Sequence, residues 1–157
     1  EWVVAAAWSP DGSRLATGGH RKGAVKVWDP DSGVELYTLI GHTAGVNTLA
    51  WSPDGTRLLS GSDDKTVRVW DAAIGREVFV LKGSVESVFK VTWSPDGSRF
   101  AGAGRDRIVR GWDAAGGREI YAIEGHRDSV LDLAWSPDLT RLASSTRKAV
   151  RIWSIPR

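Results

Sequence analysis

Three residues in one stretch of the chain have the side chains of a hydrolytic triad: His42, Ser60 and Asp64. A histidine held by a carboxylate can take the proton of a serine hydroxyl, which then attacks a carbonyl carbon. Such a reaction also needs hydrogen-bond donors for the oxyanion and an open pocket, and no motif indicates either. The sequence contains no glycine-rich phosphate loop and no His-Glu-x-x-His zinc motif. We therefore expect no catalytic residues, no metal site and no cofactor.

The three residues belong to a repeat that extends over the chain. Eight of the nine tryptophans fall on two ladders with a spacing of about 42 residues. One ladder opens a Trp-Ser-Pro-Asp phrase in each unit, at Trp8, Trp51, Trp93 and Trp135. The other ladder comes near the end of each unit, at Trp28, Trp70, Trp112 and Trp153. A fixed period of this length indicates stacked copies of one supersecondary unit, none of which can bury its apolar face alone.

The most regular unit predicts four short antiparallel strands. Residues 46–52 are apolar at alternate positions with one break, which indicates a β-bulge, and Ser52-Pro53-Asp54-Gly55 is a turn sequence. Further strands are expected at 57–62, 66–70 and 77–81, joined by turns rich in Asp and Gly. No segment has a sustained apolar period of 3.6 residues, so we expect an all-β fold.

These units resemble WD40 repeats over essentially the whole chain. The second unit carries the resemblance in Gly41-His42, Trp51-Ser52-Pro53-Asp54-Gly55, Ser60-Gly61-Ser62-Asp63-Asp64 and Trp70-Asp71. The resemblance implies that each unit is one blade of a β-propeller. It also implies that His42, Ser60, Asp64 and Trp70 form a structural hydrogen-bond tetrad around an indole, in place of a catalytic triad.

The other units match this tetrad only in part. The third unit keeps Asp106 and Trp112, with Ser84 in place of the histidine and Gly102 in place of the hydroxyl residue. The fourth keeps His126, Ser144 and Trp153, and the first keeps Thr17 and Trp28. We expect these three units to be held less firmly than the second. Leu139 stands where Gly55 and Gly97 stand, which predicts a strained turn or one of another type.

The chain is expected to be a single β-propeller segment, residues 1–157, with units at approximately 1–40, 41–82, 83–124 and 125–157. The fourth unit lacks an outer strand, which leaves an open sheet edge. Propellers have about four to eight blades, and the wedge shape implied by the resemblance would crowd the inner strands of a four-bladed ring, so we expect half of a larger or dimeric ring. Three outcomes remain open: a longer polypeptide that supplies the other blades, pairing with a second copy into an eight-bladed ring, or a closed four-bladed monomer or open arc. The absence of methionine favours an excerpt from a longer polypeptide.

The expected function is a protein-interaction scaffold that binds a protein or peptide. The alternative is a regulatory or sensor module of a longer signalling protein, such as a kinase or an NTPase, and an enzyme is the third reading. By their place in each unit, seven residues are candidates for partner binding: Asn47, Asp63, Phe89, Lys90, Arg105, Arg127 and Asp132. The aromatic Phe89 among cations has the composition of a binding hot spot. Alternatively, Phe89 packs at a bulge and the cations are solvated.

Composition excludes some classes of protein. Charged residues are 25% of the chain, the net charge is +2, and the charges are interspersed, so we expect no nucleic-acid binding. No apolar run is long enough to cross a membrane. The absence of cysteine and of a signal peptide favours the cytoplasm.

The recurrent Asp-x-x-Arg pairs, such as Asp11 and Arg14, are expected to bridge their own hairpins. The cations of the third strand, such as Arg68 and Arg110, are expected to be solvated.

Overall fold

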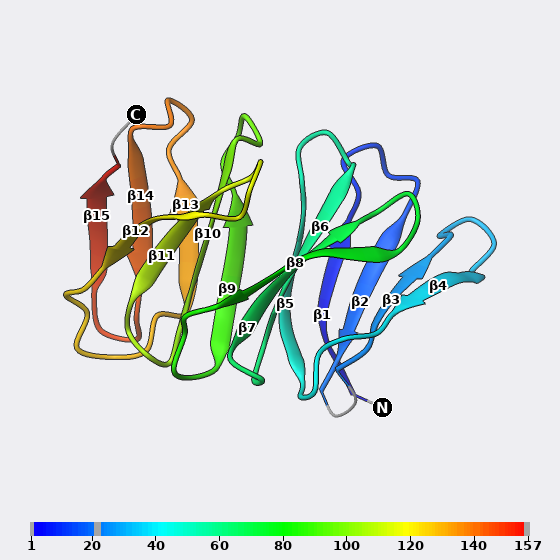
Figure 1. Ribbon diagram of the computed structural model, residues 1–157, viewed down its shortest axis with the longest axis horizontal. Coiled ribbons are helices and arrows are strands. Elements are labelled where there is room, and N and C mark those ends of the chain that lie inside the picture. Colours follow the sequence, from blue (N-terminus) through cyan, green and yellow to red (C-terminus); the bar gives the residue numbers. More distant parts are fainter. Residues whose placement is uncertain (1, 21–22, 156–157) are drawn as a thin grey trace.

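The computed structural model describes residues 2–20 and 23–155, and every regular element in them is a β-strand (Figure 1). The first sheet contains β1 (Val3–Trp8), β2 (Leu15–Gly19), β3 (Val25–Trp28) and β4 (Glu35–Leu39). The second contains β5 (Val46–Trp51), β6 (Arg57–Ser62), β7 (Thr66–Asp71) and β8 (Arg76–Lys82). The third contains β9 (Val88–Trp93), β10 (Arg99–Gly104), β11 (Val109–Asp113) and β12 (Glu119–Ile123). The fourth contains β13 (Asp132–Trp135), β14 (Arg141–Ser145) and β15 (Val150–Ser154).

Each sheet is an antiparallel meander in which strands consecutive in sequence pair with each other. The first three sheets have four strands and the last has three, which confirms the predicted all-β fold and the missing outer strand. The predicted bulge lies in β5, where the register against β6 shifts between Val46 and Thr48. β1 has the same irregularity between Val3 and Ala5. The sheets stand side by side in an arc, in sequence order (Figure 1).

Apolar side chains between neighbouring sheets hold the arc together. In the first interface, Val27 and Leu39 of one sheet pack with Leu58 and Trp70 of the next, and all four are nearly inaccessible to solvent. Two further clusters fill the second and third interfaces in the same way. A buried tryptophan contributes about 2–3 kcal/mol through apolar burial, which explains why the indoles recur at each unit.

The first tryptophan ladder also makes hydrogen bonds between sheets. The indole nitrogen of Trp51 donates to the carbonyl oxygen of Ala7 at 3.0 Å, and that of Trp93 donates to the carbonyl oxygen of Ala50 at 3.1 Å. Trp135 has the corresponding position in the fourth sheet, but its indole nitrogen is buried without a hydrogen-bond partner among the described residues. The fourth sheet therefore attaches to its neighbour without this bond, through packing, the Lys90–Asp132 ion pair and a backbone hydrogen bond from Val130 to Gly104.

The turn after each first strand is stabilised by its own side chains. In the second sheet, the hydroxyl of Ser52 donates to Asp54 at 2.6 Å and accepts from the backbone N–H of Arg57 at 2.9 Å. The fourth residue of the turn has a positive φ, at 70° for Gly55 and 64° for Leu139. The turn of the fourth sheet is thus of the same kind as the others, and Leu139 holds a backbone conformation that disfavours side chains.

Two of the arginines that follow these turns contact the neighbouring sheet. Nη1 of Arg14 donates to the carbonyl oxygen of Ala72 at 2.5 Å, and Arg57 donates to the carbonyl oxygen of Ala114. The prediction that Asp11 and Arg14 bridge their own hairpin is therefore wrong, because Asp11 accepts hydrogen bonds from serines in its own turn. These arginines contribute to the attachment of one sheet to the next.

Candidate partner-binding surface

The second sheet brings together all four residues of the predicted tetrad. The indole nitrogen of Trp70 donates to Oγ of Ser60 at 2.8 Å, and Nε2 of His42 lies 2.7 Å from the same oxygen. Nδ1 of His42 lies 2.8 Å from Oδ2 of Asp64. Asp64 also accepts from the hydroxyl of Thr66 at 2.6 Å. The result is a continuous chain of hydrogen bonds from the indole to the carboxylate.

The electrostatics of this chain favour a neutral histidine and an ionised aspartate. Burial lowers the pKa of His42, and the hydrogen bond and charge of Asp64 oppose this only in part. Burial by itself raises the pKa of Asp64, but hydrogen bonds from Thr66 and His42 outweigh it and leave that pKa lowered. Neutral His42 then donates from Nδ1 to Asp64 and accepts at Nε2 from Ser60.

Asp64, His42 and Ser60 have the connectivity of a hydrolytic triad, but this arrangement cannot attack a substrate. The Ser60 side chain is wholly buried, and its oxygen already accepts a hydrogen bond from Trp70. A nucleophile has to reach a carbonyl carbon in a pocket open to substrate. The three residues therefore act as partners for a buried indole.

The first and fourth sheets have parts of the same network. Nε2 of His126 lies 2.6 Å from Oγ of Ser144, to which the indole of Trp153 donates at 2.7 Å. Burial, followed by the charge on Arg151, lowers the pKa of His126. In the first sheet the indole of Trp28 donates to the hydroxyl of Thr17 at 2.8 Å.

An arginine replaces the histidine network in the third sheet. Nη1 of Arg110 lies 2.5 Å from Oδ2 of Asp106, and Ser84 donates to the same oxygen at 3.1 Å. A cavity of about 10 Å³ remains beside Gly102 and Trp112, where other sheets have the hydroxyl and the imidazole. The prediction that Arg110 is solvated is wrong, since it is almost fully buried. The sequence signal for this was Ser84 and Gly102, two small residues that leave room beside Asp106.

Four of the candidate partner-binding residues already form two pairs, one hydrogen-bonded and one ionic. The side-chain amide of Asn47 donates to Oδ1 of Asp63 at 2.8 Å and to the carbonyl oxygen of Val88 at 3.1 Å, which joins the second and third sheets. Nζ of Lys90 lies 2.8 Å from Oδ1 of Asp132, which joins the third and fourth sheets. These four residues support the surface, and a partner would have to compete with existing contacts to reach their polar atoms.

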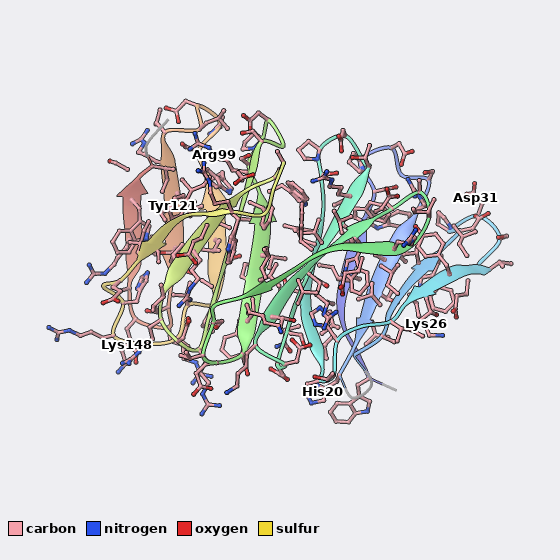
Figure 2. All side chains as sticks on the ribbon, viewed as in Figure 1. His20, Lys26, Asp31, Arg99, Tyr121 and Lys148 are labelled. Atoms are coloured by element: carbon pink, nitrogen blue, oxygen red, sulfur yellow. The ribbon has the colours of Figure 1, made fainter. Side chains whose placement is uncertain are left out.

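Phe89 and Arg105 lie in a groove of about 470 Å³ at the junction of the third and fourth sheets. Leu131 adds a second apolar side chain, and the hairpin between β14 and β15 adds two cations. We call this the cationic groove and define it by Phe89, Arg105, Asp128, Leu131, Arg147 and Lys148. Lys148 extends from the end of that hairpin (Figure 2).

The sequence reasoning identified only part of this groove. Arg127 is exposed but does not line it. Arg147 and Lys148 were missed, although they occupy the turn between the second and third strands of their unit. Asp63 was chosen from that same turn in the second unit, so position in the repeat could have indicated both cations. The turn of the fourth unit is one residue shorter than that of the second, and this difference obscured the correspondence.

Comparison with known proteins identifies the repeat. The family described as WD domain, G-beta repeat matches residues 1–29, 33–71, 75–113 and 117–154. Each of the last three matched segments begins ahead of an outer strand and ends with the third strand of the next sheet, as 33–71 does with β4 to β7. No curated protein matches the chain. Because the matched segments cover far more than half of the sequence, the chain belongs to the WD40-repeat family.

Proposed function

We propose that the protein is a non-catalytic scaffold that binds an acidic, apolar peptide segment of a partner protein in the cationic groove. The observation that carries this proposal is the composition of the groove. It combines two apolar side chains, Phe89 and Leu131, with three cations and one acid, Asp128. An aromatic anchor surrounded by arginine is typical of binding hot spots. The family supports the general role, because WD40 domains are typically interaction scaffolds.

A displayed peptide library, panned against the purified chain, tests this role. We expect enriched peptides to carry Asp or Glu close to an aromatic or aliphatic residue, because carboxylates complement the excess of cations. Replacement of Arg105 by Glu together with Phe89 by Ala should abolish the enrichment. Arg127→Glu is the matched control, because it changes another exposed arginine that lies outside the groove. Equal loss with Arg127→Glu, or none with the groove variant, would contradict the proposal.

We further propose that two copies of the chain close into an eight-bladed ring. The end sheets expose apolar side chains that are buried at the same positions elsewhere. Trp8 is 58% exposed, whereas Trp51 and Trp93 are 8% exposed. Val150 and Ile152 of the fourth sheet are 70% and 66% exposed, whereas Val67 and Val69 of the second are nearly inaccessible. Repeat proteins bury such faces against neighbouring units.

The two free faces are the complementary halves of an interface that the chain makes three times internally. A second copy related by a two-fold axis covers both faces at once and leaves none open. Light scattering should then give twice the 17.0 kDa mass of one chain. Ile152→Glu places a charge in the interface and should give a monomer, while Ile74→Glu, on an exposed turn, should not. A wild-type chain that stays monomeric at high concentration would exclude the ring.

Within residues 2–20 and 23–155, no helix is long and apolar enough to span a membrane. The cytoplasmic location remains a proposal that rests on the absence of cysteine. The scaffold role does not depend on it.

A further inference from the structure

We propose that a second groove, between the second and third sheets, binds an arginine side chain of a partner protein. The groove has a volume of about 630 Å³ and is lined by the turns after β5 and β9. We call it the Trp93 groove and define it by Pro53, Asp54, Arg57, Trp93, Asp96 and Gly97. Arg99, which follows the turn after β9, and Lys148 of the cationic groove lie at opposite ends of the molecule (Figure 2). The two grooves are therefore separate, and this inference does not rest on the cationic one.

The first interface shows which chemical group fits such a place. Between the first and second sheets, the guanidinium of Arg14 lies over the Trp51 ring, with Cζ 5.0 Å from the ring centre. Nη1 of Arg14 donates to the carbonyl oxygen of Ala72 at 2.5 Å, and Nη2 donates to that of Gly55 at 3.4 Å. An indole face attracts a cation, and carbonyl oxygens accept its N–H groups. The chain thus fills the equivalent site of the first interface with its own arginine.

The arginine of the second interface is turned away from this place. Arg57 is the equivalent of Arg14 and donates to the carbonyl oxygen of Ala114, the equivalent of Ala72. Its guanidinium, however, lies over the Phe79 ring, with Cζ 5.9 Å from the ring centre. Within the described residues, no cation lies over the Trp93 ring, and Arg57 makes no hydrogen bond to the carbonyl oxygen of Gly97, the equivalent of Gly55.

One residue of the outer strand accounts for the difference. The hydroxyl of Tyr37 donates to the Ala72 carbonyl oxygen at 2.5 Å and lies 3.5 Å from Nη1 of Arg14. Phe79 has the place of Tyr37 in the second sheet and has no hydroxyl, so it offers Arg57 only the face of its ring. The space beside Trp93 is thereby left for the guanidinium of another molecule.

Two carboxylates give the Trp93 groove a charge that attracts a cation. Asp54 accepts three hydrogen bonds, from the hydroxyl of Ser52 and from the hydroxyl and N–H of Thr56, and all three go to Oδ1. Among the described residues, Oδ2 of Asp54 accepts none. Hydrogen bonds, chiefly from the serine hydroxyl of each turn, hold the pKa of Asp54 and that of Asp96 below the usual range. Both groups are therefore ionised at neutral pH, and Arg57 balances only one of the two charges.

The groove suits arginine better than lysine and has room for it. A planar guanidinium can lie on an indole while it donates to a carbonyl and a carboxylate oxygen, whereas an ammonium group is a compact, strongly hydrated charge. The carbonyl of Gly97 and Oδ2 of Asp54 offer such acceptors beside Trp93. Leu139 has the place of Gly97 between the third and fourth sheets, where the groove measures only about 280 Å³. The absence of a side chain at Gly97 thus keeps the Trp93 groove open.

An acetylated and amidated peptide, Gly-Ala-Arg-Ala-Gly, is the probe for this site. It is titrated into the isotopically labelled full chain and followed by NMR. We expect a saturable shift of the Trp93 indole N–H and of the amides in the turns after β5 and β9, with a dissociation constant of about 1 mM. A peptide with citrulline in place of arginine keeps the shape but loses the charge, and it should not bind. A lysine peptide should bind about threefold more weakly or worse.

Two glycine variants test the groove itself. Gly97→Leu puts a leucine where the fourth sheet already has one, and it should abolish binding because the side chain fills the groove. Gly12→Leu is the matched control. It lies outside the groove and introduces the same backbone strain, at a φ of 73° compared with 71° for Gly97, with no atom within 4 Å of its Cβ. Binding to Gly12→Leu should equal binding to the wild type.

Replacement of Asp54 and Asp96 together by Asn tests the charges without backbone strain. The amides keep oxygens that accept within the turns, so the chain should fold, while binding of the arginine peptide should weaken about tenfold. Binding that survives in Gly97→Leu or in the paired Asn variant, no saturable shift at Trp93, or equal binding of the citrulline peptide would overturn the proposal. So would loss of binding in Gly12→Leu. Self-association of the chain that Gly97→Leu abolishes would overturn it too, because the occupant would then be a second copy.

Discussion

The second and fourth sheets share a network but differ in how firmly the surrounding structure holds it. Both have a histidine and an indole that meet at one serine oxygen, with distances between 2.6 and 2.8 Å. In the second sheet the histidine is also bound by Asp64, and neighbouring sheets cover both faces. In the fourth sheet, within the described residues, His126 has no aspartate partner, β15 pairs with β14 alone and one face is exposed. Similar hydrogen-bond lengths therefore do not imply similar stability.

The difference shows where the energy of such a network comes from. A hydrogen bond contributes little net free energy when water can replace it, but an unpaired buried group costs its full desolvation energy. Trp70 is 1% exposed, whereas Trp153 is half-buried. Burial by neighbouring sheets is thus what makes the tetrad of the second sheet important for stability.

The largest effect is expected from truncation of the two indoles. Trp70→Ala should lower the free energy of unfolding by about 3–5 kcal/mol, because it leaves a cavity in a closed interface. Trp153→Ala should cost roughly half as much, because its side chain already contacts water. Urea denaturation followed by far-ultraviolet circular dichroism measures both. Equal costs would show that the coverage of the second sheet adds nothing to its stability.

The serine at the centre of each network gives the next largest difference. Ser60→Ala leaves the Trp70 N–H and Nε2 of His42 buried without partners and should cost about 2–3 kcal/mol. Ser144→Ala should cost about 1 kcal/mol, because water can reach Trp153. Hydrogen exchange of the β6–β7 and β14–β15 amides locates each loss. If Ser144→Ala costs as much as Ser60→Ala, then solvent does not replace the lost bond in the fourth sheet.

The fold and the tetrad of the second sheet were predictable from sequence because local signals determine them. The Trp-Ser-Pro-Asp phrase encodes a turn closed by its own serine and aspartate, and the ladder of indoles encodes the spacing of the sheets. The role of Arg14 was not predictable, because it depends on a carbonyl oxygen of the neighbouring sheet, and the role of Arg110 was signalled only indirectly, by the two small residues Ser84 and Gly102. Arg14 finds a carbonyl oxygen 58 residues away in sequence, and Arg110 occupies space vacated by two other residues. The cationic groove likewise depends on two turns that approach only after the sheets pack.

The second and fourth sheets can also be compared through the protonation of their histidines, His42 and His126. Both have lowered pKa values, chiefly because of burial, so the unfolded chain binds protons more tightly than the folded one. This contribution to stability is complete above the unfolded pKa of about 6.5 and is lost as the pH falls below it. Each tenfold difference in proton affinity corresponds to about 1.4 kcal/mol.

Removal of Asp64 tests whether this carboxylate raises the pKa of His42 without affecting that of His126. Asp64 raises the pKa of His42, so Asp64→Asn should lower that pKa further and leave the pKa of His126 unchanged. Titration of the imidazole protons by NMR measures both values in one sample. A rise in the pKa of His42 would contradict the role assigned to the carboxylate.

The smallest effect is expected at the turn of the fourth sheet. Leu139 has a φ of 64°, while the equivalent Gly12 and Gly55 have φ values of 73° and 70°. A side chain in this conformation costs about 1–2 kcal/mol. Replacement by glycine removes this cost, but it also makes the unfolded chain more flexible, which offsets part of the gain in stability. Leu139→Gly should therefore stabilise the chain by about 0.5–1 kcal/mol.

Two further variants at this turn separate backbone strain from packing. Leu139→Ala keeps the strained φ and removes only side-chain contacts, so it should not stabilise the chain. Gly12→Ala introduces the same strain in the first sheet and should cost about 1 kcal/mol, because a Cβ there has no atom within 4 Å to clash with. If Leu139→Gly and Leu139→Ala change stability equally, packing of the leucine decides the outcome. The fourth sheet would then be weakened by its open edge and open face, and not by its turn.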